Sequence, residues 1–141
     1  MFRPLADFWE IVTSEGGERL ADAAEKHFPL TDSDHYKSFL PMLDSEDKFV
    51  RALGFYIAIK GSYSGKIGCS TVRSRAEFRL VGIDKLRNFY NPNLSFRYGS
   101  CFDTLPLHRN NFLYLDPPYY ETVSHYYGKD GELHKSFDHE A

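Results

Sequence analysis

Apolar residues recur three or four positions apart through the first two thirds of the chain, with polar residues between them. This spacing is typical of amphipathic helices that bury one face. Pro4 suits the first turn of the first such helix, because proline lacks the N–H that a helix start leaves unpaired. The segments that the spacing predicts as helical are residues 5–12, 20–27, 36–40, 49–60 and 80–90.

Residues that commonly begin or end helices flank the last two of these segments. The first of the two is expected to start near Ser45, with acidic residues in its first turn, and to end at Gly61. Ser74 and Glu77 form the S-x-x-E pattern of a capping box, which predicts that the next helix opens there. Pro92 then closes it.

Two later segments have the patterns of strands. Apolar residues alternate over 94–98, whereas 112–115 are four bulky residues in a row, typical of a strand buried on both faces of a parallel sheet. The prolines that follow cannot donate to a ladder, so the strand stops at Asp116. This places Asp116 at the carboxyl end of a central strand, where open α/β sheets bind ligands. We expect the two strands to be neighbours, with Asp116 and Ser100 at one edge.

Composition fits a single modest domain and changes this picture little. The 141 residues are 42% hydrophobic and 26% charged, and no apolar run approaches the length of a membrane span. Cys69 and Cys101 are too few for a disulfide framework and suggest a reducing, cytoplasmic setting, where we expect them to be semi-buried. His125, His134 and His139 match no zinc-binding spacing, so no metal is expected.

Charge is distributed unevenly along the chain. The net charge is −3, yet residues 60–87 hold seven basic and two acidic residues, a local charge of +5. Tyrosine, serine and glycine accompany these charges, mainly in the glycine-rich stretch 61–74, which is predicted to be a loop or hairpin turning at Ser64 and Gly65. A solvated helix face plus a basic loop would also explain the pattern. The other interpretation is a surface that contacts phosphates, with salt-sensitive DNA binding by Tyr63, Lys66, Arg73 and Arg75.

The turn Asp116-Pro117-Pro118-Tyr119 has a specific chemistry. The Asp116 carboxylate and the adjacent backbone carbonyl are two acceptors that the prolines hold in place, and Tyr119 offers a flat face beside them. Two acceptors next to an aromatic plane fit an amino group on a flat heterocycle such as adenine. Stacking on Tyr119 would stabilise an extruded base by about 1–3 kcal/mol, and enzymes that modify a base must first take it out of the duplex.

This turn resembles the [DNS]-P-P-[YFW] signature of amino-directed DNA methyltransferases, and the order of segments is similar to that of the Dam-like class of adenine methyltransferases. Residues 49–60 and the glycine turn at 62–65 are similar to the start of that class's target-recognition region. The resemblance implies methyl transfer from S-adenosylmethionine to the exocyclic amine of a flipped adenine in double-stranded DNA. It implies catalytic roles for Asp116, Pro117, Pro118 and Tyr119, and cofactor contacts from Asp116, Ser100 and Cys101.

The same resemblance implies an α/β fold. Part of a Rossmann-like methyltransferase sheet would carry a mainly helical target-recognition insertion. Residues 1–30 would be a helical remnant of the catalytic domain, 31–92 the helical recognition region with its basic loop, and 93–141 the catalytic strands and the turn.

One element of the family is missing from the sequence. The class binds its cofactor with an aromatic-x-Gly-x-Gly loop after the first strand, and no G-x-G occurs in these 141 residues. In the Dam-like order that loop precedes the recognition region, so it would lie upstream of Met1. We therefore expect an internal part of an enzyme that is inactive alone, binds S-adenosylmethionine poorly, and needs an N-terminal segment carrying the cofactor loop.

Two other interpretations of the turn remain. Residues 117–120 also satisfy P-P-x-Y, the ligand of WW-type modules that dock polyproline helices, which would make the chain a non-catalytic interaction protein. Such motifs normally lie in polar, disordered segments, whereas this one follows an apolar stretch that is expected to be buried. Asp-Pro-Pro could also be only a stiff turn that ends a strand.

Overall fold

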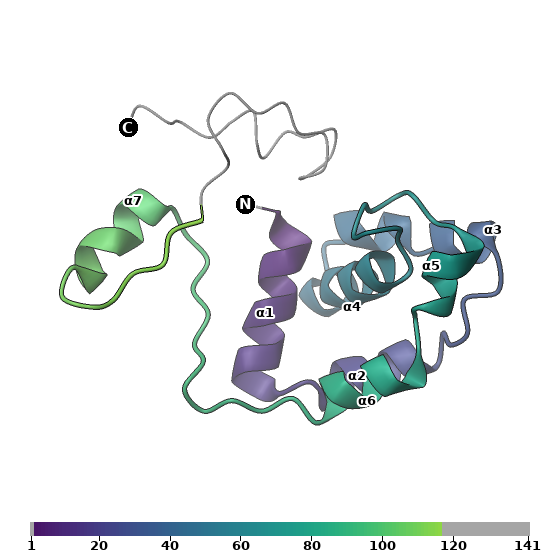
Figure 1. The fold of residues 1–141 in the computed structure, drawn as a ribbon, viewed down its shortest axis with the longest axis horizontal. Helices are drawn as coiled ribbons and strands as arrows, with labels where there is room; N and C mark the ends of the chain where they lie inside the picture. Colours follow the sequence, from purple (N-terminus) through teal and green to yellow (C-terminus); the bar gives the residue numbers. More distant parts are fainter. Residues whose placement is uncertain (1, 117–141) are drawn as a thin grey trace. The chain divides into compact units, whose positions relative to one another are not determined.

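The structure, a computed structural model, describes residues 2–116 (Figure 1). It divides into two compact units. The first is a helical unit, Arg3–Phe96, and the described residues of the second are Phe2 and 97–116. The helical unit covers most of the segments 1–30 and 31–92. The assignment of separate functions to those segments stays a prediction.

Each of the five segments predicted to be helical overlaps a helix of the structure, but the helix predicted to open at Ser74 is interrupted at 77–79 and ends at Arg87. The helical unit consists of α1 (Arg3–Glu15), α2 (Glu18–Glu25), α3 (Ser33–Lys37), the 3-10 helix η1 (Leu40–Asp44), α4 (Lys48–Lys60), α5 (Val72–Ala76) and α6 (Leu80–Arg87). The second unit holds the short helices α7 (Cys101–Thr104) and η2 (Leu105–His108).

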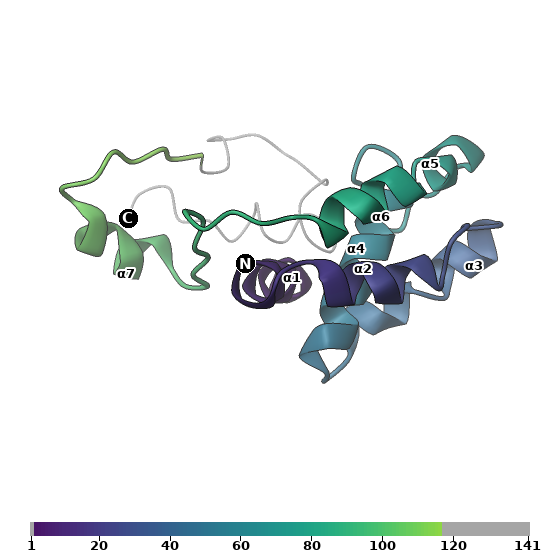
Figure 2. The same cartoon turned by 90° about the horizontal axis from the view of Figure 1, so that it is seen from below.

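Helix α4 is the centre of the helical unit. Seven consecutive residues of α4 are buried, and the helix contacts α1, α2 and η1. Helices α2 and α6 pack side by side, as Figure 2 shows. The core between these elements includes Leu20, Tyr36, Ile57, Phe78 and Ile83. Burying such side chains is the main favourable term in folding, so α4 organises the packing of the helical unit.

The helix starts differ from those predicted because short polar side chains compete for the same role. Asp47 precedes α4 and its carboxylate accepts a hydrogen bond from the Val50 N–H at 2.9 Å. Asp47 is therefore the N-cap and does not lie inside the first turn. The capping box uses Thr71 and Ser74, whose side chains each accept from the other's backbone N–H. Ser74 thus closes a box that begins three residues earlier than predicted.

The predicted α/β fold is wrong for the part of the chain that is described. Residues 2–116 contain no strand or sheet, and one isolated bridge joins Tyr63 and Lys66. Residues 94–98 and 112–115 form no ladder, and the side chains of Phe112 and Tyr114 are 96% and 82% exposed. A strand needs a partner for its backbone groups, and no other described segment pairs with these two.

The shared sheet edge predicted for Ser100 and Asp116 is absent together with the sheet. Ser100 instead caps α7, with its hydroxyl accepting a hydrogen bond from the Phe102 N–H at 3.3 Å. Asp116 is exposed.

A buried ion pair joins the first and fourth helices. Asp7 is fully buried on α1, and Arg51 of α4 donates from Nε to its Oδ2 at 2.6 Å. Arg3 lies 2.9 Å from the other carboxylate oxygen. The Nη1 of Arg51 also donates to the carbonyls of Ser45 and Glu46, at 2.6 and 2.8 Å, so one guanidinium holds α1 and the start of α4 together.

We predict that Arg51→Met destabilises the helical unit by about 3–5 kcal/mol, because it leaves the Asp7 carboxylate buried without its main partner. The measurement is urea unfolding followed by circular dichroism. Lys48→Met is the matched control, since Lys48 pairs with Glu10 at 2.8 Å but is 46% exposed. Its loss should cost about 0–1 kcal/mol. Equal losses in both variants would contradict the central role of the buried pair.

Candidate nucleic-acid interface

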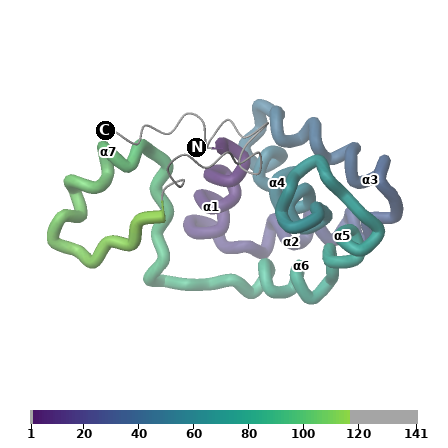
Figure 3. Tube along the Cα trace, turned by 45° about the horizontal axis from the view of Figure 1, so that its top comes forward, coloured from purple at the N-terminus to yellow at the C-terminus, as the bar shows by residue number. Residues whose placement is uncertain are grey.

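A tight turn stands in the loop between α4 and α5, as predicted (Figure 3). Ser64 and Gly65 both have positive φ, 51° and 75°, and the Lys66 N–H donates to the Tyr63 carbonyl at 2.9 Å. Two successive residues in the left-handed region are the signature of a type I′ turn, which favours glycine at the second position. The turn presents Tyr63, whose side chain is 59% exposed.

The loop is fastened to the core by the hydroxyl of one buried tyrosine. Tyr36 of α3 donates to the carbonyl of Ala58 at 3.1 Å and accepts from the Gly68 N–H at 3.0 Å. Burial raises the pKa of Tyr36, and the hydrogen bond from Gly68 acts in the opposite direction. The hydroxyl stays protonated at neutral pH and can make both bonds at once.

A second anchor lies at the base of the loop. The hydroxyls of Ser70 and Ser74 both donate to the Gly61 carbonyl at 3.0 Å. Gly61 itself has no room for a side chain, because a Cβ there would lie 2.6 Å from the Leu30 side chain and 2.9 Å from the Tyr36 ring. The base of the loop is thus closed by close packing as well as by hydrogen bonds.

The cations of this region divide into neutralised and available ones. Arg79 pairs with Glu77 at 3.0 Å, and Arg87 pairs with Asp22, Glu25 and Asp84. Within residues 2–116, the basic side chains of the 60–87 segment that make no ion pair include Lys60, Arg73, Arg75 and Lys85.

The four predicted DNA contacts all lie on the anchored loop or at its end on α5. Arg73 is exposed on α5, and Lys66 and Arg75 are half-buried. The Nη1 of Arg75 lies 3.5 Å from the Ser70 hydroxyl, which connects α5 to the loop. Tyr63 completes the group. We call residues 62–75 the basic loop.

Sequence reasoning missed Tyr36. Its spacing marked it as a buried residue of a helix, which it is, and nothing local indicates that its hydroxyl supports a loop that follows α4. The signal that could have found it is chemical. A tyrosine whose hydroxyl is buried needs a polar partner.

The structure brings the predicted catalytic and cofactor-binding residues into no common site within residues 2–116. Pro117, Pro118 and Tyr119 lie outside the described residues. Ser100 and Cys101 lie exposed at the start of α7, so these two residues alone give no enclosed surface for the adenosine of S-adenosylmethionine. Cys69 and Cys101, expected to be semi-buried, are both exposed. Residues 2–116 contain no group of His, Cys, Asp or Glu side chains suited to a metal.

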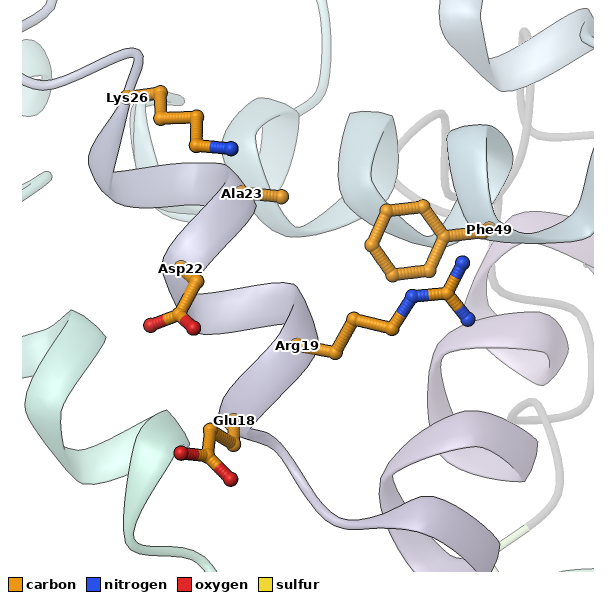
Figure 4. A pocket seen from close by; sticks show the side chains of 6 residues that line it. All are labelled: Glu18, Arg19, Asp22, Ala23, Lys26 and Phe49. Carbon is orange, nitrogen blue, oxygen red and sulfur yellow. The ribbon is translucent and has the colours of Figure 1, made fainter.

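A surface pocket of about 450 Å³ lies between α2 and the start of α4. Figure 4 shows its lining, in which the guanidinium of Arg19 lies 4.2 Å from the centre of the Phe49 ring. Glu18 and Asp22 balance the charges of Arg19 and Lys26. Because the aromatic face is already occupied by a cation and the charges cancel, the pocket selects neither anions nor cations.

We predict that Tyr36→Phe loosens the loop while leaving the helices folded. The variant loses two hydrogen bonds, one of which holds the loop. The free energy of opening the loop should fall by about 1 kcal/mol, so the Gly68 amide should exchange roughly fivefold faster. Hydrogen exchange followed by NMR checks this. Tyr56→Phe is the control. Tyr56 is also a buried tyrosine, and burial raises its pKa to about 12. Its hydroxyl makes no hydrogen bond to a described residue of the loop, unlike that of Tyr36. Unchanged exchange at Gly68 in the Tyr36 variant would count against the anchor.

No helix within residues 2–116 is long and apolar enough to cross a membrane. Comparisons of the chain with protein-family models, with curated proteins and with solved structures find no match.

Proposed function

We propose that this protein acts in the methylation of adenine in DNA, with the helical unit binding the duplex through its basic loop and the Asp116-Pro117-Pro118-Tyr119 turn holding the flipped adenine. The single observation that supports DNA binding is that Lys60, Arg73 and Arg75, on and beside the anchored loop, make no ion pair within residues 2–116. The motif at 116–119 supports the chemistry.

Available cations matter because an arginine that already pairs with a carboxylate gains little from a phosphate. Within residues 2–116, Arg73 and Arg75 have no carboxylate partner to give up, and each phosphate contact they make would release a condensed counterion from DNA. Arg87, in contrast, faces three carboxylates. The proposed interface is therefore narrower than the whole 60–87 segment.

The proposed chemistry at the turn concerns the amine of the base. The Asp116 carboxylate and a neighbouring backbone carbonyl accept its two N–H bonds, which favours a pyramidal nitrogen with its lone pair directed outwards. S-adenosylmethionine supplies the methyl group in the family that the turn resembles. Tyr119 stacks on the extruded ring.

The second candidate function, a P-P-x-Y ligand for WW-type modules, gains support from one observation. The apolar residues 112–115 were expected to be buried, which argued against a ligand motif next to them, and all four are exposed in the structure. The two functions use different side chains, because the ligand motif ends in Tyr120 whereas base stacking is assigned to Tyr119.

We predict that the chain binds duplex DNA weakly and that log K falls by about 0.9 per phosphate contact for each unit of log salt concentration. Reversing three charges in Lys66→Glu, Arg73→Glu and Arg75→Glu should abolish the binding. Fluorescence anisotropy of a labelled duplex, titrated at several salt concentrations, gives the affinity and its dependence on salt.

The control for this variant reverses three cations elsewhere on the helical unit, Arg19→Glu, Lys26→Glu and Lys37→Glu. It has the same net charge and should keep most of the affinity. Identical losses in the two triple variants would mean that total charge, and not the basic loop, determines binding.

We also predict that a duplex with 2-aminopurine at the target adenine becomes more fluorescent on binding, because the base leaves the stack. Asp116→Ala should abolish the increase and Tyr119→Ala should weaken it, with duplex affinity changed less than about threefold, and the same order should hold for methyl transfer from tritiated S-adenosylmethionine when a segment carrying the cofactor loop is supplied. Tyr120→Ala is the control and should behave like the parent. If Tyr120→Ala has the larger effect and a WW-type module binds the chain, the interaction function is correct.

A further inference from the structure

A second surface pocket of about 350 Å³ lies beside the basic loop. One wall is the turn between α2 and α3, and the other is α5 with the residues that follow it. Its lining consists of Phe28, Pro29, Leu30, Thr31, Val72, Arg75, Ala76, Phe78 and Arg79. The volume is at the lower end of the range of about 300–1,000 Å³ that small-molecule sites occupy, so it suits one flat group and not a long segment.

The lining combines aromatic and aliphatic groups with positive charge. Phe78 is buried, and Phe28 packs against it with ring centres 6.2 Å apart while staying 37% exposed. Arg75 and Arg79 are the charged residues of the lining, which contains no carboxylate. Val72 lines the mouth of the pocket and is 78% exposed.

The pocket beside the loop differs from the pocket between α2 and α4 in its charge and in the exposure of its aromatic ring. That pocket also has an aromatic ring and two cations, but Glu18 and Asp22 cancel their charge and Arg19 covers Phe49. In the pocket beside the loop, the Phe28 ring is 37% exposed, and within residues 2–116 no cation lies over it. Arg79 donates to the Ala76 carbonyl and to Glu77, each at 3.0 Å, which fixes its side chain at the rim.

We propose that this pocket accepts one unpaired nucleotide of a bound DNA strand, with the base against Phe28 and the adjoining phosphate on Arg75, since Arg79 is already paired with Glu77. The inference rests on the proposed DNA-binding function. An aromatic ring beside arginines is the usual arrangement for single-stranded nucleic acid, where bases stack and the backbone meets cations. Arg75 belongs to both the basic loop and the pocket, so a strand that contacts the loop continues into the pocket.

The test compares a perfect duplex with the same duplex carrying a single-nucleotide bulge, by fluorescence anisotropy. We expect the bulged DNA to bind about tenfold more tightly, a gain within the range of one base stacked on an aromatic ring. Phe28→Ser should remove this gain while perfect-duplex affinity stays within about twofold. Phe49→Ser, in the other pocket, is the matched control and should keep the gain.

A second pair of variants avoids any dependence on the packing of Phe28. Val72→Glu adds a carboxylate at the mouth of the pocket on an exposed position, and Val72→Gln adds a neutral group of the same size. Only the glutamate should abolish the preference for the bulge, because it repels the phosphate.

The outcomes separate the two proposals. Absence of binding to either DNA would overturn the proposed function and this inference with it. Equal binding of perfect and bulged DNA, or a preference that survives both Phe28→Ser and Val72→Glu, would overturn this inference alone. An acidic peptide with one aromatic residue that occupies the pocket more tightly than bulged DNA would show that the partner is a protein, which also overturns the nucleotide assignment.

Discussion

The contact between Asp7 and Arg51 determines where α4 lies, and the position of α4 determines the rest of the helical unit. A carboxylate with no exposed surface is costly to bury, and only a close, well-oriented guanidinium offsets that cost. Arg51 provides this contact and uses its remaining donors on the carbonyls of Ser45 and Glu46. A hydrophobic contact could slide by a turn at moderate cost, but this pair fixes α1 and α4 in one register.

A short series of contacts connects α4 to the basic loop and holds the loop in place. Helix α4 ends at Gly61, whose carbonyl receives two hydroxyl donors and whose Cα lies against Leu30 and Tyr36. Tyr36 connects the Ala58 carbonyl at the end of α4 to Gly68 in the loop. The proposed interface is thus built on the best-packed helix of the unit, although the loop itself is exposed.

The helices and the turn could be predicted from the sequence because the information that specifies them is local. Apolar spacing located all the helices of the core, and the Ser64-Gly65 pair located the turn, since few residues accept positive φ. The long-range contacts could not be predicted. Asp7 and Arg51 are 44 residues apart, and Tyr36 and Gly68 are 32 apart, with no pattern to connect them.

The prediction of strands at 94–98 and 112–115 was wrong for a related reason. Four bulky residues at 112–115 indicate that the segment could be buried, but a strand also needs a neighbour, and residue pattern alone does not supply one. Of the candidate site, the sequence located the glycine turn at Ser64 and Gly65 but did not indicate which cations of 60–87 pair with carboxylates. The pairing of Arg87 with Asp22 and Glu25 depends on how α2 and α6 pack, which no spacing reveals, whereas Arg79 pairs with its near neighbour Glu77.

For the proposed DNA partner, the anchoring of the loop by Tyr36, Ser70 and Ser74 also sets the terms of association. A loop that is folded before contact loses little conformational freedom on binding, so little interaction energy is spent on ordering it. Association then lacks the large negative heat-capacity change of folding coupled to binding. The on-rate is governed by the encounter of charged surfaces, and it depends on ionic strength more than on how fast the loop closes.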